Sequence, residues 1–159
     1  MRTLLIIDVQ CGFISEKNKH IPHLIEELQY DYDLVIVTSF VNEEHSQFRE
    51  ILGWDGFSPD SDEIKLAFKP RSGAITSDRC RYSCVNRKLI DLLTSMGVDS
   101  VDICGFETDI CVSKCAVDLF DRGITPFVLK DYCGTTASNE MEKSSLQILA
   151  RYIGKQHII

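Results

Sequence analysis

Cys111 lies a few residues after a predicted strand, at a position suited to nucleophilic chemistry. The apolar run from Val101 to Cys104 suits a buried strand, which Gly105 ends. A helix is predicted to begin near Cys111, where Thr108 or Asp109 can cap its free N–H groups. The positive end of a helix dipole lowers the pKa of a thiol and favours the reactive thiolate. The alternative is a buried structural cysteine, because free cysteine is among the most buried residue types.

Two further residues can complete a reactive site with this cysteine. Asp8 lies near the end of the apolar run Thr3–Val9, and Lys69 ends a short candidate strand that begins at Leu66. Asp8 can take the proton of the thiol, and Lys69 can stabilise the thiolate by its charge. The backbone turn before Cys111 can donate N–H groups to a tetrahedral intermediate. Each residue also has an ordinary structural interpretation, a turn cap for Asp8 and a solvated surface residue for Lys69.

The elements that would position these residues alternate between strands and helices. Alternation of this kind implies parallel β-α units with right-handed crossovers. It predicts an α/β fold, a three-layer α/β/α sandwich with a mostly parallel central sheet, and ligands bind such sheets beyond the carboxyl ends of the strands. The predicted strands are Thr3–Val9, Asp33–Thr38, Ser100–Gly105, Thr125–Leu129 and a possible edge strand Gln156–Ile159, and the predicted helices are His23–Gln29, Ser83–Met96, Cys111–Arg122 and Asn139–Tyr152.

Length and charge narrow the class of protein. A chain of 159 residues fits one domain, expected over residues 1–159. The net charge of -7 argues against a nucleic-acid partner, because there is no Lys/Arg excess to neutralise phosphates. No basic amphipathic helix or long apolar run indicates a membrane partner. The run Met1–Ile7 is too short for a secretory leader, so a cytoplasmic location with reduced thiols is expected.

The seven cysteines raise the question of a metal site. Cys80 and Cys84 are four residues apart, as are Cys111 and Cys115, which would place each pair on one helical face. Structural zinc sites usually use closer C-x-x-C pairs. The spacing therefore disfavours a zinc site made of these four thiols.

Three motifs follow one another along the chain in an informative order. The motifs are D-x-Q-x-x-F at Asp8, Gln10 and Phe13; K-x-x-x-(G/A) from Lys69; and G-x-x-T-D-x-C-V at Gly105, Thr108, Asp109, Cys111 and Val112. In this order and spacing the chain resembles the isochorismatase-like cysteine hydrolases, which include nicotinamidases and N-carbamoylsarcosine amidases. The motif with the nucleophile is the most specific of the three, and the lysine motif is weak alone.

The resemblance implies a role for each motif residue. Asp8 would be the general base, Lys69 the partner of the thiolate and Cys111 the nucleophile. A cis peptide between Phe106 and Glu107 would aim the N–H groups of Glu107 and Cys111 into an oxyanion hole. The implied activity is hydrolysis of a small amide or carbamoyl C–N bond through a thioester. Isochorismatases proper act on an enol ether and do not need the cysteine.

The expected substrate pocket lies beside these residues. Gln10, Phe13, Trp54 and Phe106 are its candidate lining residues, although the aromatic ones can equally anchor loops. The family usually has a small residue where Glu107 stands in this chain. If the Glu107 side chain points inward, it favours a cationic group on the substrate and disfavours a carboxylate.

The resemblance also bears on metals and partners. Family members with a catalytic metal carry an Asp-x-His pair and a further His after the second strand. Here only His45 remains, beside Glu43 and Glu44, so no metal and no cofactor are expected. The expected partners are a small-molecule substrate and further copies of the chain, in a homodimer or higher homo-oligomer.

Functions from other classes compete with the hydrolase. A small-molecule-binding or thiol-redox module on the same fold would perform no hydrolysis, and its thiols would include Cys104, Cys111, Cys115 and Cys133. A subunit that regulates a partner has no support in the sequence. The substrate itself is not indicated.

Overall fold

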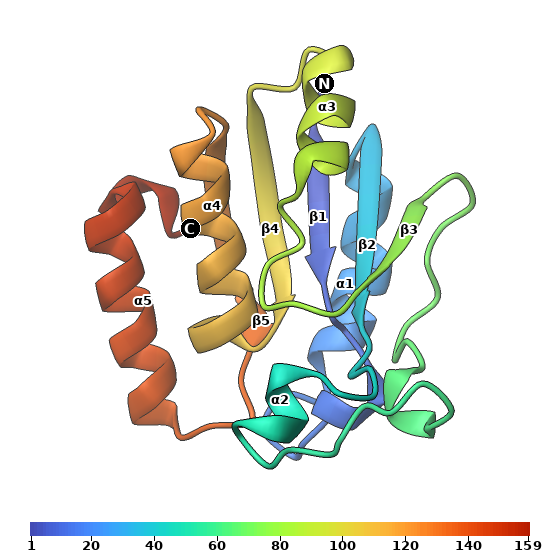
Figure 1. Ribbon diagram of the computed structural model, residues 1–159. Coiled ribbons are helices and arrows are strands. Elements are labelled where there is room, and N and C mark those ends of the chain that lie inside the picture. The colour runs from blue at the N-terminus through green and yellow to red at the C-terminus, as the bar shows by residue number, and fades with distance from the viewer.

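Five parallel strands form the centre of the computed structural model, which describes residues 1–159 (Figure 1). The strand order is β3-β2-β1-β4-β5, and every neighbouring pair is parallel. This arrangement confirms the predicted α/β sandwich with a parallel central sheet. The strands are β1 (Thr3–Ile7), β2 (Leu34–Phe40), β3 (Ile75–Arg79), β4 (Ser100–Phe106) and β5 (Thr125–Gly134).

Helices cover both faces of the sheet. Figure 1 shows α1 behind the strands and α3 and α4 in front of them, with α5 beside α4. Three of the helices begin with side-chain caps, because side-chain oxygens accept from backbone N–H groups of the first turn. The capping residues are Ser46, Asn86 and Ser138. No helix combines the length and the apolar character needed to cross a membrane. The helices are α1 (Ile21–Leu28), α2 (Gln47–Glu50), α3 (Arg87–Ser95), α4 (Ser113–Asp121) and α5 (Asn139–Ile153).

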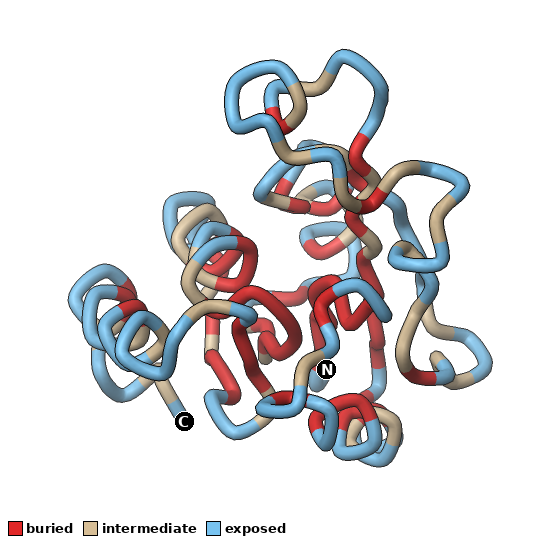
Figure 2. The backbone as a smooth tube through the Cα atoms, turned by 90° about the horizontal axis from the view of Figure 1, so that it is seen from below, coloured by how far each residue is buried: buried red, intermediate tan, exposed pale blue.

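The central strand β1 is buried along its whole length. All five of its residues are buried, as expected for a continuous apolar run between two layers of helices. The buried residues gather between the sheet and its helices, while most loops are exposed (Figure 2). The buried strand thus holds the backbone of Asp8, which follows it directly, in a fixed position.

The third strand differs from the prediction. Leu66–Lys69 forms no strand, and Leu66 makes only an isolated bridge with Gln10. The third strand is instead β3, four of whose five residues are exposed. An edge strand of this kind lacks the apolar pattern from which strands are predicted. The predicted edge strand at Gln156–Ile159 is also wrong, because only Ile158 forms a bridge.

Gly105 allows β4 to approach β1 closely beside the end of β1. Its φ angle of 122° is one that other residues rarely adopt. A Cβ atom at this position would lie 2.0 Å from the carbonyl oxygen of Ile7. Only glycine therefore fits between the two strands at the point where the chain turns toward Cys111.

We expect Gly105→Ala to destabilise the protein by about 3 kcal/mol or more, because the new methyl group meets backbone rather than a movable side chain. Gly97→Ala is the matched control, since Gly97 also has a positive φ but a methyl group added there would have no other atom within 4 Å. That variant should lose only about 1 kcal/mol. Urea unfolding followed by circular dichroism measures both. Equal losses in the two variants would contradict the close approach of the strands.

Candidate active site

A buried ion pair lies at the carboxyl ends of the first three strands. The Asp8 side chain is completely buried, and the Arg79 guanidinium contacts its carboxylate, with Nη2 beside Oδ2. Arg79 Nε also donates to Asp8 Oδ1 at 3.2 Å. The hydroxyl of Thr38, from β2, donates to the same oxygen at 3.0 Å. Three neighbouring strands thus hold one carboxylate in place.

The cation of this pair is Arg79 rather than the expected Lys69. Lys69 is exposed, its N–H donates to Glu26, and its carbonyl accepts from Gln29. These contacts fix Lys69 against the α1 side of the molecule. Arg79 ends β3, and its guanidinium also lies over the Phe40 ring, 5.4 Å from the ring centre. The structure therefore brings Arg79 to Asp8 and places Lys69 elsewhere.

Cys111 sits in a single π-helical turn, Thr108–Val112, which leads into α4. The predicted helix start is thus close to the observed one, but neither Thr108 nor Asp109 caps it by a side-chain hydrogen bond. Burial raises the pKa of the Cys111 thiol to about 11, although the charge of Arg79 and hydrogen bonding to it act in the opposite direction. At neutral pH the thiol is therefore protonated and needs a base.

Glu107 precedes the π-helical turn and points into the protein. Its carboxylate accepts from the Thr136 N–H at 2.9 Å and from the hydroxyls of Thr136 and Thr135 at 3.0 Å and 3.1 Å. The loop after β5 thus holds this side chain. The peptide between Phe106 and Glu107 is trans, since the structure has no cis peptide bond, and the expected cis bond is not found.

A cavity of about 260 Å³ opens beside Cys111. Of the predicted lining residues, Phe13 and Trp54 are present in its wall. Gln10 is not, because its amide hydrogen-bonds to the backbone of Phe40 and Ile64 and so joins three segments of chain. Phe106 is completely buried in the core. The lining consists of Phe13, Phe40, Phe48, Leu52, Trp54, Tyr82, Glu107, Ile110, Cys111 and Thr136.

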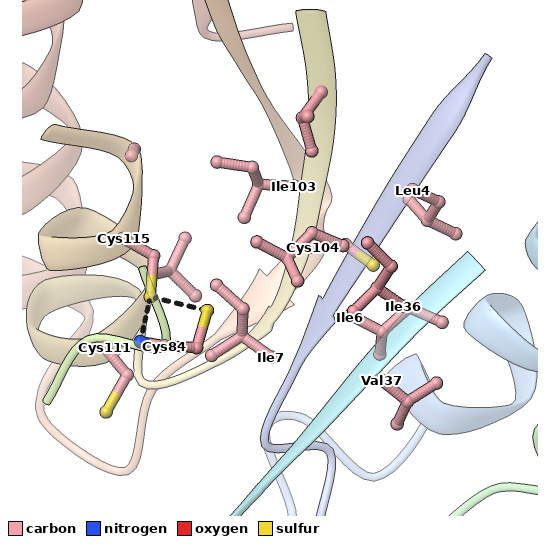
Figure 3. Packing of buried hydrophobic residues seen from close by; sticks show 14 of the residues in the cluster. Leu4, Ile6, Ile7, Ile36, Val37, Cys84, Ile103, Cys104, Cys111 and Cys115 are labelled. Carbon is pink, nitrogen blue, oxygen red and sulfur yellow. Dashed lines mark hydrogen bonds between the residues drawn. The ribbon is translucent and has the colours of Figure 1, made fainter. Parts of the chain in front are cut away.

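Two other cysteines, Cys84 and Cys115, lie in contact with each other. The sulfur atoms of Cys84 and Cys115 are 3.4 Å apart, and the Cys84 N–H also donates to Cys115 Sγ (Figure 3). The Cys111 sulfur points in a different direction. A hydrogen bond from Cys84 lowers the pKa of Cys115, and the same bond together with burial raises the pKa of Cys84. The pair gives up its first proton more easily than its second.

Comparison with known proteins identifies the family. A family model described as the isochorismatase domain matches residues 2–156. The chain belongs to the isochorismatase family. A stretch of 79 residues, half of this chain, is 34% identical to isochorismatase domain-containing protein 2 of Rattus norvegicus. That stretch covers 36% of the rat protein, so the chain spans only about a third of this curated relative.

Solved structures of isochorismatase-like hydrolases share the fold. Pyrazinamidase of Pyrococcus horikoshii, in complex with zinc, matches with a TM-score of 0.84 and 18% identity over 96% of each chain. Nicotinamidase of Bacillus subtilis matches with a TM-score of 0.81, 18% identity and the same coverage. A cysteine hydrolase from Pseudomonas syringae pv. phaseolicola has a TM-score of 0.82 and 18% identity, over 96% of this chain and 86% of its own. At these identities the likeness shows the fold alone.

The residues after β2 do not fit the metal that some isochorismatase-like hydrolases bind. Asn42 lies there, and its amide donates to the carbonyls of Trp54 and Gly56. His45 is exposed, and its Nδ1 atom lies 3.9 Å from Glu50. No three His, Cys, Asp or Glu side chains are grouped so that they could hold a metal ion. A metal ion would find no suitable set of donors at this place.

We expect alkylation of Cys111 by iodoacetamide to become faster up to a pH of about 11, because the thiolate forms only as the pH approaches the pKa. Arg79→Met should shift this profile to higher pH, whereas Arg79→Lys keeps the charge and should shift it less. Mass mapping after short exposures measures the rate, with exposed Cys11 as the internal reference. Circular dichroism at each pH shows whether the fold persists. If the alkylation rate of Cys111 levels off near neutral pH, the pKa of this thiol is not raised by burial as described.

Proposed function

We propose that this protein hydrolyses the C–N bond of a small amide or carbamoyl compound through a thioester on Cys111. The observation that carries the proposal is that Arg79 links Asp8 to Cys111. Arg79 contacts Asp8, and its charge acts on Cys111, which lines the cavity. In the proposed mechanism Asp8 is the base, Arg79 the cation and Cys111 the nucleophile. The amidase names of two structural relatives agree with this class of substrate.

The first step forms the bond between sulfur and carbon. Asp8 takes the proton of the Cys111 thiol as the sulfur attacks the carbonyl carbon. The carbonyl electron pair moves to oxygen, and backbone N–H groups of the turn at Cys111 stabilise the resulting oxyanion. Arg79 compensates the negative charge that appears on sulfur, although its guanidinium stands where the family resemblance implies a lysine.

The later steps release the two products. Protonated Asp8 gives its proton to the nitrogen, the C–N bond breaks, and ammonia or an amine leaves a thioester on Cys111. Asp8 then takes a proton from water as the oxygen attacks the thioester carbon. The C–S bond breaks, the acid leaves, and the thiol regains its proton. No external oxidant or reductant takes part.

The Cys84–Cys115 pair supports a second candidate, a thiol-redox module. Two thiols at 3.4 Å can form a disulfide if an external disulfide such as oxidised glutathione accepts two electrons and two protons. Both thiols are nearly or completely buried, however, which limits access of an oxidant. Cys111 would have no part in this chemistry. The two candidates therefore depend on different cysteines.

A screen for ammonia release from small amides and carbamoyl compounds, including nicotinamide and pyrazinamide, should find a substrate. On that substrate, Cys111→Ala should abolish turnover, and Asp8→Asn should slow it by on the order of a hundredfold or more. Lys69→Met is the matched control for the corrected cation and should change little. Cys115→Ala should leave the reaction in place.

Unchanged hydrolysis by Cys111→Ala would refute the thioester mechanism. Loss of activity in Lys69→Met with full activity in Arg79→Met would restore Lys69 as the cation of the site. Redox activity that survives in Cys111→Ala and disappears in Cys115→Ala would favour the second candidate.

A further inference from the structure

Glu107 places an acidic side chain in the wall of an otherwise uncharged cavity. No other lining residue is acidic, and none is basic. The side chain is buried, and no Lys, Arg or His lies within ion-pair distance of it. Its hydrogen-bond donors, from Thr135 and Thr136, are all neutral. A buried carboxylate of this kind lacks a counter-charge.

The hydrogen bonds to Glu107 are themselves incomplete. The hydroxyl of Thr135 lies 3.1 Å from Glu107 Oε2 but only 2.6 Å from Asp109 Oδ1. A hydroxyl has one hydrogen, so it cannot donate to both carboxylates at once. Burial and the charge of Asp109 raise the pKa of Glu107, against the hydrogen bonds from Thr136. The carboxylate would therefore gain from a positive group that enters the cavity.

The ion pair of Asp8 and Arg79 does not compensate the charge of Glu107. Asp8 and Arg79 contact each other, so their charges largely cancel. Cys111 is protonated at neutral pH because its pKa is raised to about 11. The charge that remains beside the cavity is that of Glu107. It lies close enough to Cys111 to raise the pKa of that thiol.

The aromatic rings of the cavity suit the same kind of ligand. Trp54 stacks on Phe40 with ring centres 5.7 Å apart, and Phe48 meets Trp54 and Tyr82 edge to face. The faces of Trp, Tyr and Phe attract cations, and this attraction is strongest where water is excluded. A volume of about 260 Å³ limits the ligand to a small molecule.

We propose that this cavity selects small amides or carbamoyl compounds that carry a positively charged nitrogen close to the reacting carbonyl, with Glu107 and the aromatic rings binding the cation. The reacting carbonyl lies at Cys111 and the cation at Glu107. The identity of the reacting group rests on the proposed function, whereas the selection of a cation does not. A substrate with a carboxylate in the same place would meet Glu107 as a like charge.

Ligand binding to Cys111→Ala tests the preference without turnover. Trp54 is the single tryptophan of the chain and lines the cavity, so its fluorescence reports occupancy directly. The probes are trimethylammonioacetamide, its uncharged isostere 3,3-dimethylbutanamide, and the anion of malonamic acid. The cationic amide should bind about tenfold more tightly than the isostere, and the anion should bind least.

Glu107→Gln in the same background keeps the shape of the side chain and removes its charge. We expect the preference for the cationic amide over its isostere to fall severalfold. Asp109→Asn is the matched control, because it removes one charge from the same turn but does not line this cavity. It should keep most of the preference.

Two results would overturn the proposal. One is equal or tighter binding of the uncharged isostere in the Cys111→Ala protein, a comparison that needs no change at Glu107. The other is a cation preference that persists undiminished in a folded Glu107→Gln variant. If the Cys111→Ala protein binds cations selectively but the protein with Cys111 in place hydrolyses none of the amides, only the proposed function is contradicted.

Discussion

The ion pair between Asp8 and Arg79 is the interaction on which the rest of the site depends. Both charges are removed from water, with 0% and 6% of their side chains exposed. Removal of one partner leaves the other buried and unpaired, at a cost of about 3–5 kcal/mol. Asp8 follows the central strand and Arg79 ends the edge strand, with Thr38 between them. The pair thus joins the exposed strand β3 to the centre of the sheet.

The charges of the site follow from this pair. Because the guanidinium pairs with Asp8, it does not neutralise the carboxylate of Glu107 in the wall of the cavity. Opposing effects set the pKa of Cys111, since burial and Glu107 raise it while Arg79 lowers it. The outcome is a thiol that is protonated at neutral pH and needs a base, the role proposed for Asp8. The same balance leaves the cavity with a negative wall, which is the basis for the inferred preference for a cation.

The sequence predicts the buried parts of this molecule well. The strands that carry Asp8 and lead to Cys111 are continuous apolar runs, and β1 and β4 lie close to their predicted positions. The order of the three motifs is enough to indicate the family, which the match over residues 2–156 shows. The side-chain periodicity of the larger helices is equally clear. Burial on both faces of a strand leaves a strong signal in the sequence.

The cation could not be predicted in the same way. Strand β3 reads Ile-Thr-Ser-Asp-Arg and is mostly exposed, so its end does not stand out in the sequence. Lys69 follows an apolar run and has the expected residue type, which favours the wrong segment. A search for any cation about thirty residues before Cys111 would include Arg79. The side-chain amide of Gln10 hydrogen-bonds to the backbone of Phe40. This long-range contact is likewise not encoded in any local pattern of the sequence.

A double-mutant cycle on the ion pair tests the account most directly. The free energy of unfolding would be measured by urea denaturation for the original protein, Asp8→Asn, Arg79→Met and the double variant. If the two charges depend on each other, the double variant should lose less stability than the sum of the single losses, by about 2–3 kcal/mol. Additive losses would show that Asp8 and Arg79 do not form the pair around which the site is built.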